Sequence, residues 1–178
     1  MKKFYSLLLI GFLLSSISCS KDDDNSDNKE NTSLAGEWQM EEFQYNGTTT
    51  VKQGDMMDES SYIGTAKDID VTMTFNESEK TWESSGNYVL ELVTKVNGET
   101  QTSTEPYSNI SGSGTFTVDG PTLKLGYDNQ AGGFEIDEAT ISILTENELL
   151  LEFEYSETSM VSGYEVSLVV EGSQRFSR

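Results

Sequence analysis

Alternation of apolar and polar residues is the feature that most constrains what this chain can fold into. In DIDVTMTF, the apolar residues Ile69, Val71, Met73 and Phe75 alternate with aspartate and threonine. Successive side chains of a β-strand point to opposite faces, so this segment predicts a strand with one buried and one solvated face. The same two-residue period recurs in NYVLELVTKV, GTFTV, TLKLGY, ATISIL, LLLEFEY and YEVSLVV.

Turn signals separate these segments. Asn97-Gly98 is a strong signal for a two-residue hairpin, Asp119-Gly120 is similar, and TENE after Leu144 indicates a longer turn. The spacing predicts about eight short antiparallel strands, each apolar on one face. Because such a sheet removes its edges by closing on itself, we expect an all-β fold, a single up-and-down antiparallel barrel.

Three segments depart from this pattern. In GEWQMEEFQY the alternation changes phase, which predicts a β-bulge near Glu41-Glu42. TQTSTEPYSNISGSG lacks apolar alternation and contains Pro106, so it is expected to be an edge strand or an irregular loop. Residues 55–62, DMMDESSY, are expected to form a single helical turn. The phase change separates Trp38 and Met40 from Phe43 and Tyr45.

The first residues have the organisation of a secretory signal peptide. Lys2 and Lys3 precede an apolar stretch over 4–14, which is too short to span a bilayer stably, and small or weakly polar residues follow at 15–18. We therefore expect a signal peptide over 1–18, a flexible acidic tether over 19–33, and one folded domain over 34–178.

The lone cysteine, Cys19, lies directly after the expected cleavage region. SISC resembles the lipobox of bacterial lipoproteins, and the resemblance implies that Cys19 is acylated and becomes the anchored N-terminus. The alternative is an ordinary signal peptide with an incidental cysteine. Lys21, Asp22 and Asp23 resemble the signal that exports some Gram-negative lipoproteins to the cell surface, so we expect an outer-membrane anchor, with surface exposure ahead of the periplasmic face.

Composition excludes several kinds of chemistry. The chain has no histidine and one cysteine, which removes the Ser-His-Asp triad, the Cys-His pair, internal disulfides and the commonest zinc ligands. Without Lys2 and Lys3, nine of the 11 basic residues remain against 31 acidic ones, a net charge of −22. Nucleic acid is therefore an unfavourable partner. DDDNSDN and YDNQAGG lack EF-hand spacing. We expect no enzyme, cofactor or specific metal site.

The domain resembles the lipocalin-like lipoproteins of Gram-negative bacteria. LAGEWQMEEFQYNG is similar to the family's opening strand, with Gly36 and Trp38 as Gly-x-Trp and Asn46-Gly47 at the end. SGSGTFTVDGPTLKL, ATISILTENELLLEF and SQRFSR resemble later strands in the same order. The hairpin within 81–109 is longer than the family's compact pattern and is expected to project from the barrel.

The resemblance implies structural roles for residues near the two ends of the domain. Gly36 is expected to let the chain turn at the barrel floor, Trp38 to close the narrow end, and Arg175 or Arg178 to lie over the indole. Inward-facing side chains are expected either to line a cavity for a small apolar ligand or to fill the interior. The candidate lining residues are Met73, Phe75, Tyr88, Leu90, Phe153 and Tyr155.

Two functions follow as expectations. The first is a monomeric, lipid-anchored, non-catalytic protein that binds a small apolar or glycan-derived molecule. The alternative is a surface interaction protein with a filled barrel, which contacts a protein or polysaccharide through its loops. An enzyme would need two carboxylates converging in a cleft, and the sequence places no such pair.

Overall fold

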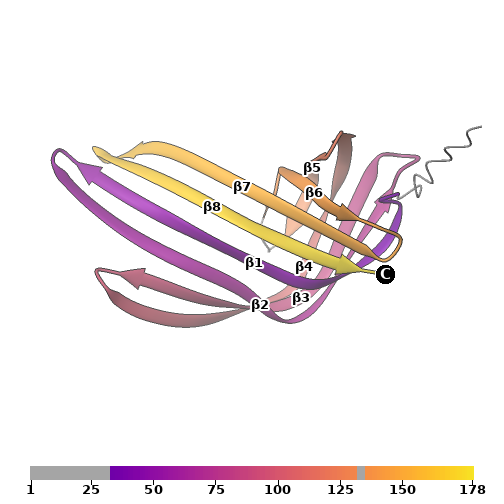
Figure 1. The fold of residues 1–178 in the computed structure, drawn as a ribbon, viewed down its shortest axis with the longest axis horizontal. Coiled ribbons are helices and arrows are strands. Elements are labelled where there is room, and N and C mark those ends of the chain that lie inside the picture. The colour runs from indigo at the N-terminus through magenta and orange to yellow at the C-terminus, as the bar shows by residue number, and fades with distance from the viewer. Residues whose placement is uncertain (1–32, 132–134) are drawn as a thin grey trace, which may run out of the picture.

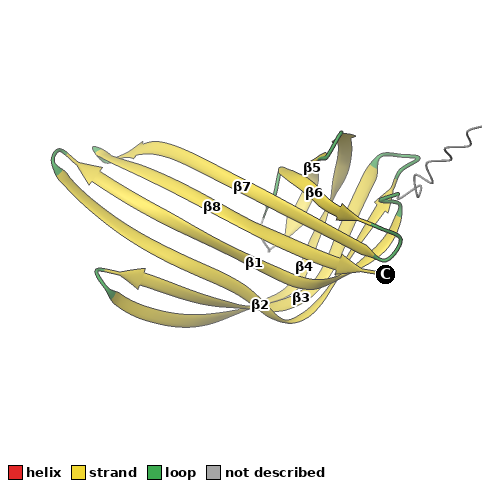
Figure 2. Ribbon diagram, in the orientation of Figure 1, coloured by secondary structure: helices red, strands yellow, loops and turns green. Residues whose placement is uncertain are grey.

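The computed structural model describes residues 33–131 and 135–178, in which every regular element is a β-strand (Figures 1 and 2). Consecutive strands pair antiparallel, and β8 pairs with β1 to close the ring. The prediction of a single up-and-down barrel of eight strands is therefore confirmed. The strands are β1 (Gly36–Gln53), β2 (Met56–Asn76), β3 (Thr81–Val96), β4 (Glu99–Asp119), β5 (Thr122–Ala131), β6 (Glu138–Leu144), β7 (Glu148–Val161) and β8 (Tyr164–Ser177).

The alternation in β2 produces the expected buried face. Val71, Met73 and Phe75 are 2%, 5% and 2% exposed, whereas Ile69 is half-buried against the same core. The core continues around the ring through side chains of every strand, including Trp82 of β3 and Phe176 of β8. Inward-facing apolar residues therefore account for the closure of this sheet into a barrel.

The bulge in β1 is also confirmed. The ladder to β2 shifts register between Gln39 and Gln44, and the ladder to β8 shifts between Met40 and Glu42. An extra residue on one strand reverses which face the following side chains occupy. As a result, Met40 before the bulge and Phe43 after it are both buried.

The expected helical turn over 55–62 is wrong. Met56 begins β2, and the segment pairs residue by residue with the end of β1, from Gln53↔Met56 to Gly47↔Tyr62. The local composition favoured neither state strongly, so the antiparallel partner that follows from the β1–β2 turn decides the conformation.

The barrel is closed at one end and open at the other. β5 and β6 are the shortest strands, with 10 and 7 residues, whereas β2 and β4 each have 21. The long strands run beyond them as a curved six-stranded sheet in the order β7-β8-β1-β2-β3-β4, which we call the extension (Figure 1). The turns β1–β2, β3–β4 and β7–β8 lie at its far end.

The extension has two edges. On one side, Glu99–Ile110 of β4 pairs with β3, while pairing to β5 begins at Ser111. The segment that contains Pro106 is therefore an edge strand, which was one of the two expected outcomes. The predicted Asn97-Gly98 turn joins β3 to β4, with φ of 50° and 85°, and this hairpin does project beyond the closed part of the barrel (Figure 1).

Candidate functional site

The closed end is sealed by the tryptophan that the sequence singled out. Trp38 is 0% exposed, and its Nε1 donates a hydrogen bond to the Leu34 carbonyl oxygen at 2.8 Å. Gly36, two residues earlier, has φ of +115°, a conformation that side chains with a Cβ rarely adopt. Gly36 therefore allows the chain to enter β1 at an angle that places the indole across the barrel floor.

Of the two arginines expected near the indole, Arg178 takes this position. Its guanidinium carbon lies 4.1 Å from the centroid of the Trp38 ring, and its nitrogens donate to the carbonyl oxygens of Ala35 and Ser33. Arg175 instead pairs with Glu42 and Glu148 on the outer surface. Arg178 thus joins the end of β8 to the start of the domain, and all of these contacts are structural.

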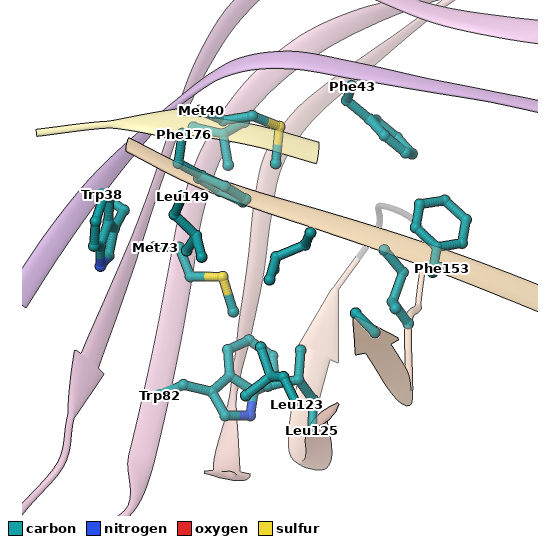
Figure 3. Close-up of a cluster of buried hydrophobic side chains, with 14 of the residues drawn as sticks. Trp38, Met40, Phe43, Met73, Trp82, Leu123, Leu125, Leu149, Phe153 and Phe176 are labelled. Atoms are coloured by element: carbon teal, nitrogen blue, oxygen red, sulfur yellow. The ribbon is translucent and has the colours of Figure 1, made fainter. Parts of the chain in front are cut away.

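The interior above this floor is almost filled. Side chains from opposite strands meet across the barrel, as Figure 3 shows for Met73, Trp82, Leu123 and Leu149. The hollow that remains among these side chains has a volume of about 80 Å³. Phe75 is packed edge-to-face against Phe116, with ring centroids 5.2 Å apart. The closed part is therefore a packed core with room for little more than a few solvent molecules.

The six candidate lining residues separate into two groups. Met73 and Tyr88 border the small internal cavity, and Phe75 and Leu90 are buried in the core. Phe153 and Tyr155 border a second, larger hollow at the open mouth of the barrel. The structure therefore does not bring the predicted set together around a single cavity.

A short loop separates the two hollows. Ile136, between β5 and β6, is 7% exposed and borders both of them. The Tyr127 hydroxyl holds this residue at both backbone atoms, accepting from its N–H at 2.9 Å and donating to its carbonyl oxygen at 3.0 Å. Tyr127 therefore fixes the residue that seals the packed core from the mouth.

The hollow at the mouth, which we call the mouth groove, has a volume of about 620 Å³ and is open to solvent along the extension. Its floor is aromatic and aliphatic, and its rim is acidic, with no basic residue among those that line it. The volume lies within the roughly 300–1,000 Å³ that is usual for small-molecule sites. The floor comprises Tyr45, Tyr62, Ile136, Phe153, Tyr155, Leu168 and Val170, and the rim comprises Glu135, Asp137, Glu138 and Glu154.

Glycines on neighbouring strands make room for the aromatic rings of the floor. Tyr45 is paired with Gly64 and Tyr62 with Gly47, and a Cβ at either glycine would lie 2.3 or 2.4 Å from the facing ring. Gly172 is likewise paired with Phe153, and a Cβ at Gly172 would lie 2.5 Å from the Phe153 ring. Each ring can therefore lie flat over a cross-strand glycine, which leaves the space above the sheet open.

The tyrosines form a connected cluster. The rings of Tyr45 and Tyr62 meet edge-to-face at 6.1 Å, and those of Tyr88 and Tyr107 are stacked at 4.9 Å. Burial raises the pKa of Tyr45, Tyr62 and Tyr88, and the neighbouring Tyr107 raises the pKa of Tyr45 and Tyr88 further. The hydroxyls of Tyr45, Tyr62 and Tyr88 are consequently neutral donors and acceptors throughout the physiological range.

Sequence reasoning identified Phe153 and Tyr155 but missed Tyr45 and Tyr62 as site residues. The available signal was the pair of short motifs YNG at 45–47 and YIG at 62–64, each of which places a tyrosine two residues before a glycine. In antiparallel register, these motifs set each tyrosine opposite the other strand's glycine. The register between β1 and β2, which depends on the turn that joins them, brings the two motifs together in one site.

Metal-binding clusters and membrane-spanning helices are absent from the part of the chain that the structure describes. Within 33–131 and 135–178, no three acidic, histidine or cysteine side chains are grouped so as to hold a metal ion. Across these same ranges, none of the elements is a helix that could cross a membrane. Cys19, Lys21, Asp22 and Asp23 lie outside the described residues.

Comparison with known proteins gives little similarity. No protein-family model matches the chain, and no curated protein matches it. Among solved structures, the chain is similar to the crystal structure of Ail, the attachment invasion locus protein of Yersinia pestis. It has 10% sequence identity, covers 80% of this chain and 99% of that chain, and has a TM-score of 0.25. At this score the backbones do not superpose, so the likeness carries no argument about function.

Proposed function

We propose that this protein is a lipid-anchored, lipocalin-like, non-catalytic binding protein of the outer membrane, and that its ligand occupies the mouth groove. The observation that carries the proposal is that the side chains of the core leave a hollow of only about 80 Å³, whereas the aromatic-floored mouth groove measures about 620 Å³. A small apolar or glycan-derived molecule would find aromatic surfaces and neutral hydroxyl groups in the groove, whereas the packed interior has no room for it.

The position of Ser33, at which the expected tether meets the folded domain, supports a particular orientation of the barrel relative to the membrane. Ser33 and Ala35 lie at the closed end, where their carbonyl oxygens accept hydrogen bonds from Arg178. An acylated Cys19 would therefore hold the closed end toward the bilayer, and the mouth groove and the extension would point away from it. The outward faces of the strands carry residues such as Glu37, Glu41 and Glu83, all exposed, which suits a domain held in water beside the membrane.

A fluorescent probe tests the site directly. The Cys19→Ser chain, recovered without detergent, is titrated with N-phenyl-1-naphthylamine, a neutral apolar dye whose emission rises on leaving water. We expect saturable binding that Tyr62→Ala weakens about tenfold, because the substitution removes an aromatic ring from the floor of the groove. Tyr164→Ala is the matched control, since Tyr164 is 38% exposed and does not line the groove. Equal binding by the two variants would place the dye elsewhere.

The filled interior favours a second candidate function. A barrel without a large internal cavity fits a surface interaction protein that meets a macromolecular partner through its projecting strands. Several large apolar side chains at the far turns are exposed, among them Met56 at 66% and Met160 at 69%. Exposed apolar residues gathered at one end of a domain are typical of contact surfaces.

A further inference from the structure

The outer edge of β7 is a regular strand edge that remains open. β6 pairs with β7 no further than Glu152, and from Glu154 to Val161 the ladder of β7 involves β8 alone among the described strands. This stretch contains no proline and no residue with positive φ. It forms one side of the extension in Figure 1. Long regular edges offer unpaired backbone groups to another strand, and proteins usually block them.

The opposite edge shows what a blocked edge looks like in this molecule. In β4, Pro106 lacks an N–H, and Asn109 has φ of 56° with its N–H bonded to the Asn87 side chain at 2.9 Å. The ladder from β3 is also irregular between Gly86 and Tyr88. The two edges of one sheet therefore differ, and only that of β7 keeps an uninterrupted row of backbone groups.

The β7–β8 turn defines which groups point outward. Ser162 and Gly163, with φ of 52° and 83°, form a two-residue turn flanked by the Val161↔Tyr164 pair. Residues that flank such a turn bond to each other, so odd-numbered residues of β7 bond to β8 and even-numbered residues point their N–H and C=O groups away. The outward-pointing groups belong to Glu154, Ser156, Thr158 and Met160.

Side chains next to this edge define the chemistry of a partner. On the outer face, Glu154 lies directly opposite Glu171, and neither forms an ion pair with a described residue. Like charges in directly opposed positions are destabilising until a cation approaches. On the concave face, Tyr155 and Val161 are 46% and 53% exposed. Between them on this face lies Glu157, which accepts a hydrogen bond from the Tyr155 hydroxyl and is paired with Leu168 of β8. A strand added beside Glu154 and Tyr155 would thus meet two carboxylates on the outer face, and mainly apolar groups with a single carboxylate on the concave face.

We propose that the β7 edge binds an extended peptide segment in which basic and apolar side chains alternate, by adding it to the sheet as a further strand. Basic side chains would lie beside Glu154 and Glu171, and apolar ones beside Tyr155. The tether of this chain, SKDDDNSDNKENTS, is acidic and lacks apolar residues. A second copy would place against this edge another that carries the same two carboxylates, Glu154 and Glu157, so neither is a suitable occupant.

Short synthetic peptides test this inference on the Cys19→Ser chain. The probe is an acetylated peptide of alternating lysine and valine, labelled with a fluorophore and followed by anisotropy. One control is the corresponding peptide of alternating glutamate and valine. Two further controls are lysine–valine peptides with every second amide N-methylated, one at the lysine amides and the other at the valine amides. We expect the unmodified basic peptide to bind tightly and the glutamate–valine peptide not to bind. Only one of the two N-methylated peptides should bind, because an added strand bonds to β7 through alternate residues and its other amides point away. Ser156→Pro removes one outward N–H and should weaken binding about tenfold, whereas Ser156→Ala should not.

Charge and backbone contributions are separated by two further comparisons. Glu154→Gln should weaken binding of the basic peptide while raising the unfolding temperature of the free chain, because it relieves the repulsion from Glu171. Equal binding of the unmodified peptide and of both N-methylated peptides would overturn the proposal, since the attraction would then be charge alone. A dimer that Ser156→Pro converts to a monomer would also overturn it, by assigning the edge to a second copy. If Ser156→Pro does not fold, Thr158→Pro and the N-methylated peptides distinguish the same outcomes.

Discussion

The guanidinium of Arg178 covers the indole of Trp38 at 4.1 Å, so a residue just beyond β8 packs on the first large side chain of β1. The two strands are also neighbours in the ring, and the contact lies where their ladder ends at Gln39↔Ser177. The same arginine donates to carbonyl oxygens of residues 33 and 35. The pair therefore couples barrel closure to the segment through which the domain would be anchored.

Trp38→Ala should lower the free energy of unfolding by about 3–5 kcal/mol, because it removes a large, fully buried side chain and leaves a cavity at the floor. Chemical denaturation followed by circular dichroism measures the change. Val118→Ala is the control, because Val118 is 46% exposed and its truncation should have little effect. A Trp38→Ala protein with an unchanged midpoint would show that the indole is not part of the core.

Arg178→Ala should cost about 1 kcal/mol, of the size expected for an exposed cation–π contact. Arg178→Lys should recover part of this loss, since the charge remains but the planar fork that reaches several carbonyl oxygens does not. The decisive measurement is a double-mutant cycle with Trp38→Ala. If Arg178→Ala costs the same with and without the indole, the two side chains are not coupled.

Gly64→Ala should weaken binding of N-phenyl-1-naphthylamine at the mouth groove. The added Cβ would lie 2.3 Å from the Tyr45 ring, so the ring must move into the space that a ligand would use. Gly126→Ala is the matched control, where the nearest atom is the Thr115 hydroxyl oxygen at 3.1 Å. A fluorescence titration of both variants checks this, and unaltered binding by Gly64→Ala would argue against a role for Tyr45.

Stability should fall in alkali as the pH rises from about 10 to 12. Burial raises the pKa of Tyr127 to about 12 from its ordinary value of 10.0, so the folded state holds this proton more tightly than the unfolded chain does. The resulting stabilisation is complete below pH 10 and is lost as the pH passes through 12. Urea denaturation at several pH values measures it. Tyr127→Phe should be less stable near neutrality, having lost its hydrogen bonds to Ile136, and should show a shallower alkaline decline.

Cys19→Ser should release the protein from the membrane, because acylation is expected at this residue. Replacing Lys21, Asp22 and Asp23 with alanine should leave acylation intact and move the protein from the cell surface to the periplasmic side. Fatty-acid labelling and protease treatment of intact cells are the measurements. A Cys19→Ser chain that stays in the membrane fraction contradicts the anchor, and an alanine variant still cleaved on intact cells reduces the acidic residues to a linker.

Much of the fold could be predicted because it depends on patterns within short segments of the sequence. The alternation in β2 defines its buried face, the phase change around Glu41-Glu42 locates the bulge, and Asn97-Gly98 is a sufficient signal for its turn. Each of these depends on the geometry of a strand or a tight turn and needs no knowledge of distant residues. The error over 55–62 arose where the pattern is polar and the pairing partner alone decides.

By itself, then, the sequence determined the all-β class and the ring of apolar faces, and the family resemblance implied the tryptophan floor. Only the tertiary structure decided where space remains. Whether inward side chains fill a barrel depends on their volumes across the ring, and the length of β5 and β6 relative to their neighbours decides where closure ends. The mouth groove exists because register places Tyr45 over Gly64 and Tyr62 over Gly47, and the open edge of β7 exists because its pairing with β6 ends at Thr140↔Glu152. Register and strand length are long-range properties, which no local periodicity specifies.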